Sequence, residues 1–134
     1  MLYIIDFDKV LFRNKYGQFY KEYLTEDKII NKEEFEEKLN IKIEKSILLT
    51  GRGIGQKDII LDLLSKKGWY FNRTIFRKWG IGNPISYMKR YWEWKIKEII
   101  NINNKYESTI IDDDPIIIKR CKELNINTIF FNLN

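Results

Sequence analysis

Blocks of apolar residues alternate with amphipathic stretches along this chain, and each kind of block predicts a different element. Continuous apolar runs such as residues 47–49 are typical of parallel strands that are covered on both faces. Apolar residues at helical spacing, such as Ile59, Ile60, Leu63 and Leu64, predict amphipathic helices. The predicted strands are 2–6, 45–50, 74–78, 109–111 and 128–131, and the predicted helices are 57–67, 86–100 and 116–124.

Strands that alternate with helices in this way predict one domain of the α/β class, spanning residues 1–134. We expect a Rossmann-like three-layer sandwich with a mainly parallel central sheet and right-handed crossovers. Neither repeats nor low-complexity tracts interrupt the pattern. The chain is long enough for one hydrophobic core and too short for two domains.

Two segments between the predicted strands carry less regular patterns. Residues 13–44 have room for a loop or hairpin and one helix that starts at Thr25, with Ile29, Ile30, Phe35 and Leu39 as its apolar positions. The many charged residues around these positions predict a solvated face. Residues 68–88 have room for little more than a strand and a loop, and Gly68 is the expected stop of the preceding helix.

Polar side chains gather where three of the predicted strands end. Asp6 and Asp8 follow the first strand, and residues i and i+2 of an extended segment point to the same side. Their like charges repel each other, and a bound cation would relieve that repulsion. Ligands of parallel sheets bind at the carboxyl ends of the strands, so we expect three groups to meet at one edge. These groups are Asp6 with Asp8, Thr50 with Gly51 and Arg52, and Asp112 with Asp113 and Asp114.

The bland role of such an Asp pair is to form a turn or to cap a helix. For Asp114, which precedes Pro115, we expect that role: the N-cap of the last helix. Gly51, Gly53 and Gly55 match the spacing of no phosphate-binding glycine motif, so we interpret them as a turn that lets the backbone approach the site.

Composition limits the chemistry that these residues can perform. The chain has no His and a single Cys, Cys121, so zinc sites and His-based triads lack their usual residues. Apolar residues at 44% and charged residues at 32% are typical of a folded globular protein. Neither a membrane-spanning stretch nor a signal peptide is evident, so we expect a soluble cytoplasmic protein without a membrane partner.

The formal net charge of +5 makes nucleic acid a plausible partner. The competing explanation is a coding bias, because the chain is rich in Ile, Asn and Lys and contains no Ala. Aromatic residues interleaved with cations between residues 69 and 92 could stack bases and hold phosphates. The alternative is that these aromatics belong to the core. The aromatics are Trp69, Tyr70, Phe71, Trp79, Tyr87, Tyr91 and Trp92, and the cations are Arg73, Arg77, Lys78, Lys89 and Arg90.

Three segments resemble the motifs of the haloacid dehalogenase superfamily. Residues 3–12 are similar to its first motif, a hydrophobic strand followed by D-x-D-x-[TV], and residues 47–52 are similar to its second. Residues 110–113 resemble its acidic fourth motif. Within the superfamily, the Leu-Thr-Gly-Arg form and the Trp94-Lys95 segment resemble the Swiss Army Knife RNA-repair-like group and the phosphatase domain of polynucleotide kinase-phosphatases.

This resemblance implies a magnesium-dependent phosphatase. Asp6 would be the nucleophile that forms an aspartyl-phosphate, and Asp8 would be the general acid and base. The magnesium ligands would be Asp6, the backbone carbonyl of Asp8 and an acid of the Asp112-Asp113 pair, with Asp113 favoured as the direct ligand.

The resemblance also implies roles for the second and third motifs. Thr50 would donate its hydroxyl to a phosphoryl oxygen together with nearby backbone N–H groups; its alternative role is to cap the loop. Arg52 would clamp a phosphate; its alternative is a solvated loop charge. For the lysine that steadies the nucleophile we favour Lys95, with Lys89 and Lys97 as alternatives.

In the superfamily that the chain resembles, members that act on small molecules usually carry a cap domain. The insertions at residues 13–44 and 68–88 are small, so the resemblance implies a capless fold or a minimal cap, with an open cleft that favours a large substrate. We expect a phosphomonoesterase that acts on an RNA or DNA end, and a kinase or ligase on another chain is a candidate partner. One alternative keeps the chemistry with a nucleotide, another small phosphate ester or a phosphoprotein as substrate. Another is a non-catalytic binding module that retains the fold.

Overall fold

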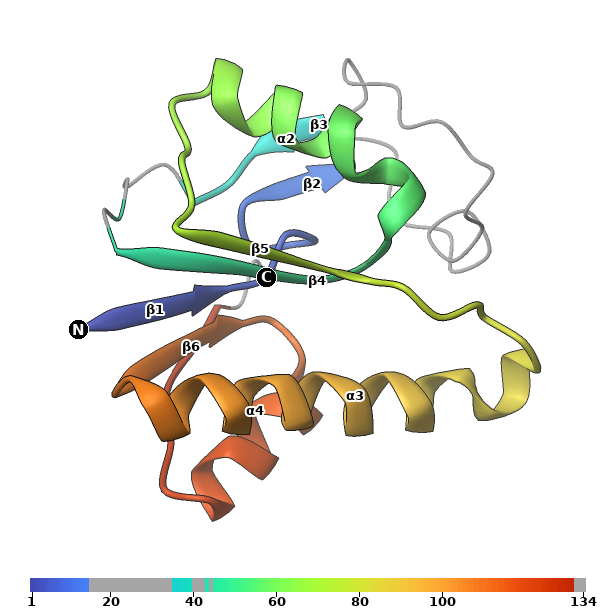
Figure 1. The fold of residues 1–134 in the computed structure, drawn as a ribbon, viewed down its shortest axis with the longest axis vertical. Helices are drawn as coiled ribbons and strands as arrows, with labels where there is room; N and C mark the ends of the chain where they lie inside the picture. Colours follow the sequence, from blue (N-terminus) through green and yellow to red (C-terminus); the bar gives the residue numbers. More distant parts are fainter. Residues whose placement is uncertain (15–34, 40–42, 44, 132–134) are drawn as a thin grey trace.

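A five-stranded, all-parallel sheet forms the centre of the protein (Figure 1). The computed structural model describes residues 1–14, 35–39, 43 and 45–131. The strand order is β5-β4-β1-β6-β7, which confirms the predicted α/β class and Rossmann-like architecture. The strands are β1 (Leu2–Ile5), β4 (Ser46–Gly53), β5 (Arg73–Arg77), β6 (Ser108–Asp112) and β7 (Asn127–Phe130).

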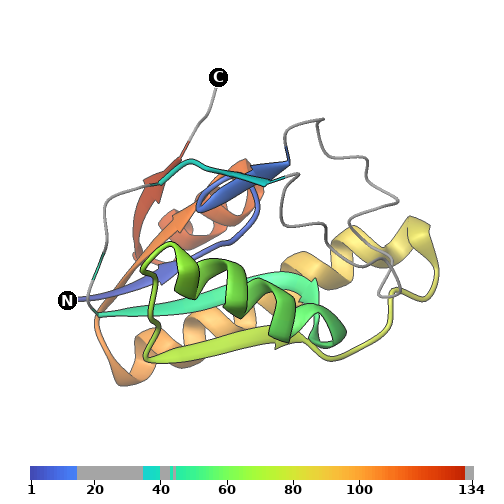
Figure 2. The ribbon, with the colours of Figure 1, turned by 90° about the horizontal axis from the view of Figure 1, so that it is seen from above.

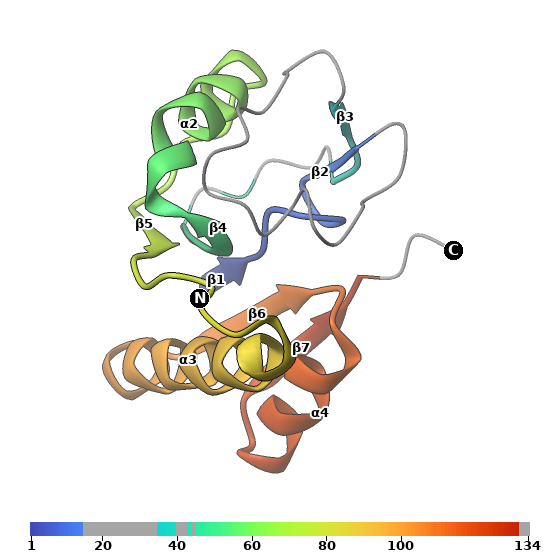
Figure 3. The same ribbon diagram turned by 90° about the vertical axis from the view of Figure 1, so that its right-hand side faces the viewer.

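Helices cover both faces of this sheet. The helix α2 (Lys57–Lys66) packs on one face, and α3 (Pro84–Lys105) and α4 (Pro115–Glu123) lie on the other (Figure 3). A short 3-10 helix, η2 (Ile54–Gln56), leads from β4 into α2. The strands β2 (Phe12–Asn14) and β3 (Phe35–Glu37) form a separate antiparallel pair on the α2 side, as the view from above also shows (Figure 2).

Side-chain alternation along the central strands divides the core into two halves. Ile5, Leu48 and Ile111 pack on the α2 side, whereas their neighbours Ile4 and Ile110 pack on the side of α3 and α4. The half on the α2 side contains buried aliphatic and aromatic side chains, and the other half contains buried aliphatic side chains and Cys121, which is what a parallel sheet covered on both faces requires. Side chains that follow in β1 or β6 with the same alternation therefore point in turn to the α2 side and to the side of α3 and α4.

Capping residues fix where the helices near the site begin and end. Asn83 and Asp114 cap α3 and α4 by accepting hydrogen bonds from the backbone N–H groups two residues on, and a Pro follows each cap. The role predicted for Asp114 is thus confirmed. Gly68 adopts a φ of 83° after α2, and Trp69 N–H donates to the Leu64 carbonyl at 2.9 Å, so the helix stops as predicted.

One predicted element is partly wrong. Phe35 and Leu39 were expected on a helix, but residues 35–37 form β3, which pairs with β2. The earlier part of that predicted helix, from Thr25 to residue 34 with Ile29 and Ile30, lies outside the described residues. Between Gly68 and α3 the structure has only β5 and loops, as expected. Within the described residues, every helix is too short or too polar to cross a membrane.

Candidate functional site

The predicted groups meet at the carboxyl edge of the sheet, where a buried lysine contacts two of the acids. Lys95 Nζ lies 3.1 Å from Asp6 Oδ1 and 2.8 Å from Asp112 Oδ2. Asp112 lies two residues beyond Ile110 in the same strand, so its side chain points to the face that α3 covers. The Lys95 side chain is fully buried. Lys89 and Lys97, the alternatives to Lys95, are exposed on α3.

Three carboxylates converge beside this lysine. One oxygen from each of Asp6, Asp112 and Asp113 lies within 4.8 Å of the other two. Together with Lys95 and Tyr91, whose hydroxyl accepts a hydrogen bond from Lys95 at 3.0 Å, they form what we call the Lys95 cluster. Three acids against one lysine leave excess negative charge, and the oxygen donors suit a hard divalent cation such as Mg²⁺. The donor set therefore fits the metal that the sequence predicts.

The charges of the Lys95 cluster shift each other's protonation. Burial raises the pKa of Asp6 well above its ordinary value, Lys95 opposes the rise, and the carboxylate of Asp112 adds to it. Burial alone would lower the pKa of Lys95, but Asp112 and Asp6 outweigh burial and raise this pKa well above its ordinary value. Lys95 is therefore a cation, and the raised pKa of Asp6 means that this acid binds a proton more readily than an ordinary carboxyl group unless another cation takes the place of the proton.

Asp112 and Asp113 differ in how far their carboxylates are already engaged. Asp112 is fully buried, binds Lys95 and also accepts a hydrogen bond from the Asp114 backbone N–H at 3.0 Å. Asp113 is only partly buried, and burial followed by the charge of Asp112 raises its pKa to about 6. Asp113 is therefore the more accessible of the two acids, although its side chain also hydrogen-bonds with Asp6. That Asp113 binds a metal directly stays a prediction.

Asp8 has a separate partner. Its two carboxylate oxygens accept from Arg52, with distances of 2.9 Å to Nε and 2.7 Å to Nη2, and we call this arrangement the Arg52 pair. The expectation that Asp6 and Asp8 share one side assumed that the strand continues through them. Strand β1 ends at Ile5, and the chain then turns, with Leu11 N–H donating to the Phe7 carbonyl at 3.0 Å. The turn gives the two carboxylates different neighbours.

Arg52 is buried, so the alternative of a solvated loop charge is wrong. Its Nη1 also donates to Gln56 Oε1 at 3.3 Å, a contact between the end of β4 and η2 that the sequence did not suggest. Thr50 is fully buried, and its hydroxyl oxygen accepts from the Arg52 backbone N–H at 3.1 Å. This bond lies within the end of β4, where the register with β5 shifts between Thr50 and Gly53, and not in a loop after the strand. It leaves the hydroxyl proton of Thr50 for another acceptor.

Gly51 brings the end of strand β4 into contact with the Lys95 cluster. A Cβ atom at this position would lie 2.3 Å from Cε2 of Tyr91, so any larger residue would collide with that ring. The Gly51 carbonyl also accepts from Arg77 Nε at 3.0 Å. The predicted turn is wrong for Gly51 and Gly53, because β4 continues through both. Gly51 is nevertheless a point of close backbone approach, and its partner is a tyrosine ring of α3.

The loop after β1 has one unusual backbone conformation. Lys9, directly after Asp8, has a φ of 61°, a left-handed conformation that a residue with a side chain adopts at a cost of about 1 kcal/mol or more. A tight backbone bond from Lys9 N–H to the Phe12 carbonyl, at 2.8 Å, holds this turn. The exposed Lys9 side chain lies near enough to Asp113 to lower its pKa, against the effect of burial.

Several aromatic residues proposed as base-stacking platforms belong to the interior instead. Trp69 and Tyr87 are buried, and Trp92 donates from its indole nitrogen to Asp114 at 2.9 Å. For Trp69 and Tyr87 the alternative of core packing is therefore correct. Trp79 is partly exposed, and the guanidinium groups of Arg77 and Arg90 each lie 5.3 Å from its ring centroid.

Comparisons with protein-family models, curated proteins and solved structures found no match for this chain. Membership of the haloacid dehalogenase superfamily therefore stays a prediction from the sequence motifs.

Proposed function

We propose that this protein is a magnesium-dependent phosphomonoesterase that works through an aspartyl-phosphate on Asp6 and acts on a polynucleotide end. The observation that carries the proposal is the convergence of Asp6, Asp112 and Asp113 around Lys95 at the carboxyl edge of a parallel sheet. An excess of buried carboxylates is costly for a fold, and such sites are where functional groups concentrate. The net positive charge of the chain favours a polyanionic substrate.

In this scheme Asp6 attacks phosphorus, the bond from phosphorus to the leaving oxygen breaks, and Asp8 gives that oxygen a proton. Water then attacks the phosphoryl group on Asp6, Asp8 takes the proton of the water, and inorganic phosphate leaves. Lys95 holds the Asp6 carboxylate in place from 3.1 Å. Bound Mg²⁺, held by Asp6, Asp113 and the backbone carbonyl of Asp8, would neutralise charge on the phosphoryl group.

The Arg52 pair adds a step to this scheme. Asp8 can act as a proton donor only when the Arg52 guanidinium no longer engages both of its oxygens. A phosphoryl group offers Arg52 the same bidentate acceptor geometry. Substrate binding would therefore move Arg52 from Asp8 to the phosphate, while Thr50 donates its hydroxyl to another phosphoryl oxygen.

The test is phosphate release with and without Mg²⁺ from an aryl phosphate, from oligonucleotides phosphorylated at the 3′ or 5′ end, and from nucleotides, sugar phosphates and phosphopeptides. Asp6→Asn should abolish release, whereas the exposed acid of α2 offers a matched control, Asp58→Asn, that should retain it. Full activity of Asp6→Asn would refute the mechanism. Preference for a small ester or a phosphopeptide would keep the chemistry and replace the substrate.

The alternative of a non-catalytic module makes a different prediction. Such a module would release no phosphate from any substrate, and the acids would serve binding alone. Thermal stabilisation by Mg²⁺ with beryllium fluoride, a phosphoryl mimic, would then show whether the site still recognises a phosphate. Stabilisation without turnover favours the module, and turnover excludes it.

A further inference from the structure

We propose that the groove along the outer edge of β5 binds the single-stranded part of a polynucleotide and leads its end to the Lys95 cluster; this inference rests on the proposed function and names its substrate. The groove encloses about 480 Å³. It is bounded by consecutive residues of β5, by the first residue of α2 and by two side chains of α3. Its volume lies in the range of ligand-binding clefts.

The groove follows the sheet edge that β5 leaves open. Strand β5 is the last in the sheet order and pairs with β4 on its other side. Figure 3 shows β5 at the outer edge of the sheet, with α2 on one side and α3 on the other. From Arg73 to Lys78 the chain takes five steps of about 3.3 Å, so the groove can follow a ligand over roughly 17 Å.

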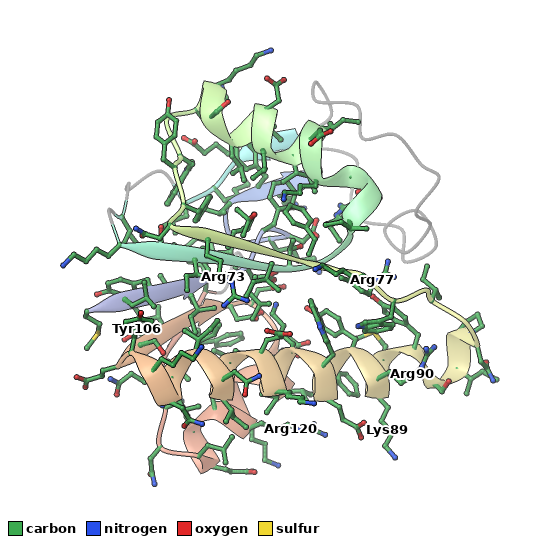
Figure 4. The ribbon with its side chains drawn as sticks, viewed as in Figure 1. Arg73, Arg77, Lys89, Arg90, Tyr106 and Arg120 are labelled. Atoms are coloured by element: carbon green, nitrogen blue, oxygen red, sulfur yellow. The ribbon has the colours of Figure 1, made fainter. Side chains whose placement is uncertain are left out.

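Charge in the groove favours a polyanion. Lys57, Arg73 and Lys78 line it, against the single acid Glu98. Arg73 and Lys78 are exposed; Arg73 is the first residue of β5 and Lys78 directly follows its last residue (Figure 4 labels Arg73). Cations at both ends of an edge strand oppose pairing with another peptide strand, whereas they attract successive phosphates of a nucleic acid.

Aromatic side chains form the wall of the groove on the α3 side. Trp79 and Trp94 both line it, with ring centroids 6.0 Å apart in an edge-to-face arrangement. Both rings are partly exposed, so each can offer an edge or part of a face to a base. Grooves that bind single-stranded nucleic acid usually combine cations with aromatic rings.

Side-chain contacts lead from the groove toward the proposed catalytic groups at two points. Trp94 directly precedes Lys95 on α3, and its ring packs 6.3 Å from Tyr91, whose hydroxyl contacts Lys95. Arg77 is buried and does not itself line the groove, but it stands between the groove residues Phe76 and Lys78 and donates to the Gly51 carbonyl. A strand lying in the groove would therefore carry its terminal phosphate toward both halves of the site.

The experiment uses the full chain and a fluorescent ten-nucleotide single strand without a terminal phosphate, with binding followed by anisotropy. The double variant Arg73→Glu/Lys78→Glu should weaken binding about tenfold or more and reduce the salt dependence by about one phosphate contact per residue. The matched control is Lys89→Glu/Lys119→Glu, because both residues are exposed, neither lines the groove, and Lys89 projects from α3 away from the sheet (Figure 4). This control should bind within about twofold of the wild type.

Hydrolysis separates the failure of the groove from the failure of the proposed function. The groove variant should hydrolyse an aryl phosphate at the wild-type rate and show a raised KM only for phosphorylated oligonucleotides. Equal binding by the groove and control variants would overturn the inference, as would equal competition by a poly-glutamate peptide. If no phosphate ester is hydrolysed but binding still depends on Arg73 and Lys78, the groove assignment stands and the phosphatase fails.

Discussion

Asp6 and Asp8 lie two residues apart after β1, but their carboxylates have different charged partners. Asp8 belongs to a balanced pair, with one carboxylate and one guanidinium joined by two hydrogen bonds. Asp6 belongs to the Lys95 cluster, where three carboxylates share one lysine. Balanced charge stabilises a loop, whereas unbalanced buried charge invites a cation or a proton. The comparison thus separates a charge-balanced pair from a cluster in which carboxylates outnumber the one lysine.

The largest effect should come from removing the one cation of the Lys95 cluster. Lys95→Met would leave Asp6 and Asp112 buried without a counterion, so we expect the free energy of unfolding at pH 7 to fall by about 3–5 kcal/mol. Urea denaturation measures this loss. Lys97→Met, at an exposed position on the same helix, should change stability by no more than about 0.5 kcal/mol. Equal effects of the two substitutions would contradict the cluster.

A smaller loss is expected when the Arg52 pair is broken. Arg52→Gln removes the charge that engages Asp8 but keeps a side chain that can donate one hydrogen bond, so we expect a loss of about 2–3 kcal/mol in the same urea assay. Arg52→Lys serves as the comparison, because it keeps the charge and loses the bidentate geometry. It should fall between the wild type and Arg52→Gln. If Arg52→Gln were as stable as the wild type, the pair would not hold the loop.

The contact between β4 and the Lys95 cluster can be broken at Gly51. Gly51→Ala would place a methyl group 2.3 Å from the Tyr91 ring, so the ring must move and Lys95 loses its hydroxyl acceptor. Overpacking of this kind costs about 1–3 kcal/mol. Gly80→Ala is the matched control, since nothing lies within 4 Å of a Cβ atom there. A thermal melt of both variants tests the contact, and unchanged melting of Gly51→Ala would argue against it.

The smallest expected effect is the change in the free energy of unfolding with pH as Asp113 titrates. The pKa of Asp113 is about 6 in the fold against 3.8 ordinarily, so the folded chain binds a proton more readily between these values. The free energy of unfolding without metal should therefore fall as the pH rises from about 4 to about 6, by about 1–2 kcal/mol for this partly exposed group. Asp113→Asn should remove this share of the slope, as urea denaturation across that pH range would show. An unchanged slope would mean that Asp113 does not titrate in this way.

The parts of the site that depend on local sequence pattern could be predicted. The apolar run at residues 47–49 and the acids at 112 and 113 mark strands and their ends without any knowledge of distant contacts. The carboxyl-edge rule then placed these groups together, and the structure brings them together there. Lys95 was favoured from its sequence neighbour Trp94, and its burial is what the fold adds.

Contacts that depend on the path of the chain could not be predicted. The Arg52 pair joins residues 44 positions apart, and it forms because the chain turns after Phe7 rather than continuing as a strand. Phe35 is similar: helical spacing suggested a helix, but pairing of β3 with β2 decides its conformation. The Gly51 contact with Tyr91 likewise requires the packing of α3 against β4.

The central claim is that Asp6, in the Lys95 cluster, forms a covalent bond to the phosphoryl group of the substrate. The most direct measurement is acid quenching of the protein during turnover of an aryl phosphate with Mg²⁺, followed by peptide mass spectrometry. We predict one phosphoryl group on the peptide that contains Asp6, lost when Mg²⁺ is chelated and absent from Asp6→Asn. Turnover with the phosphoryl group on another residue, or with no phosphorylated peptide under single-turnover conditions, would contradict the account.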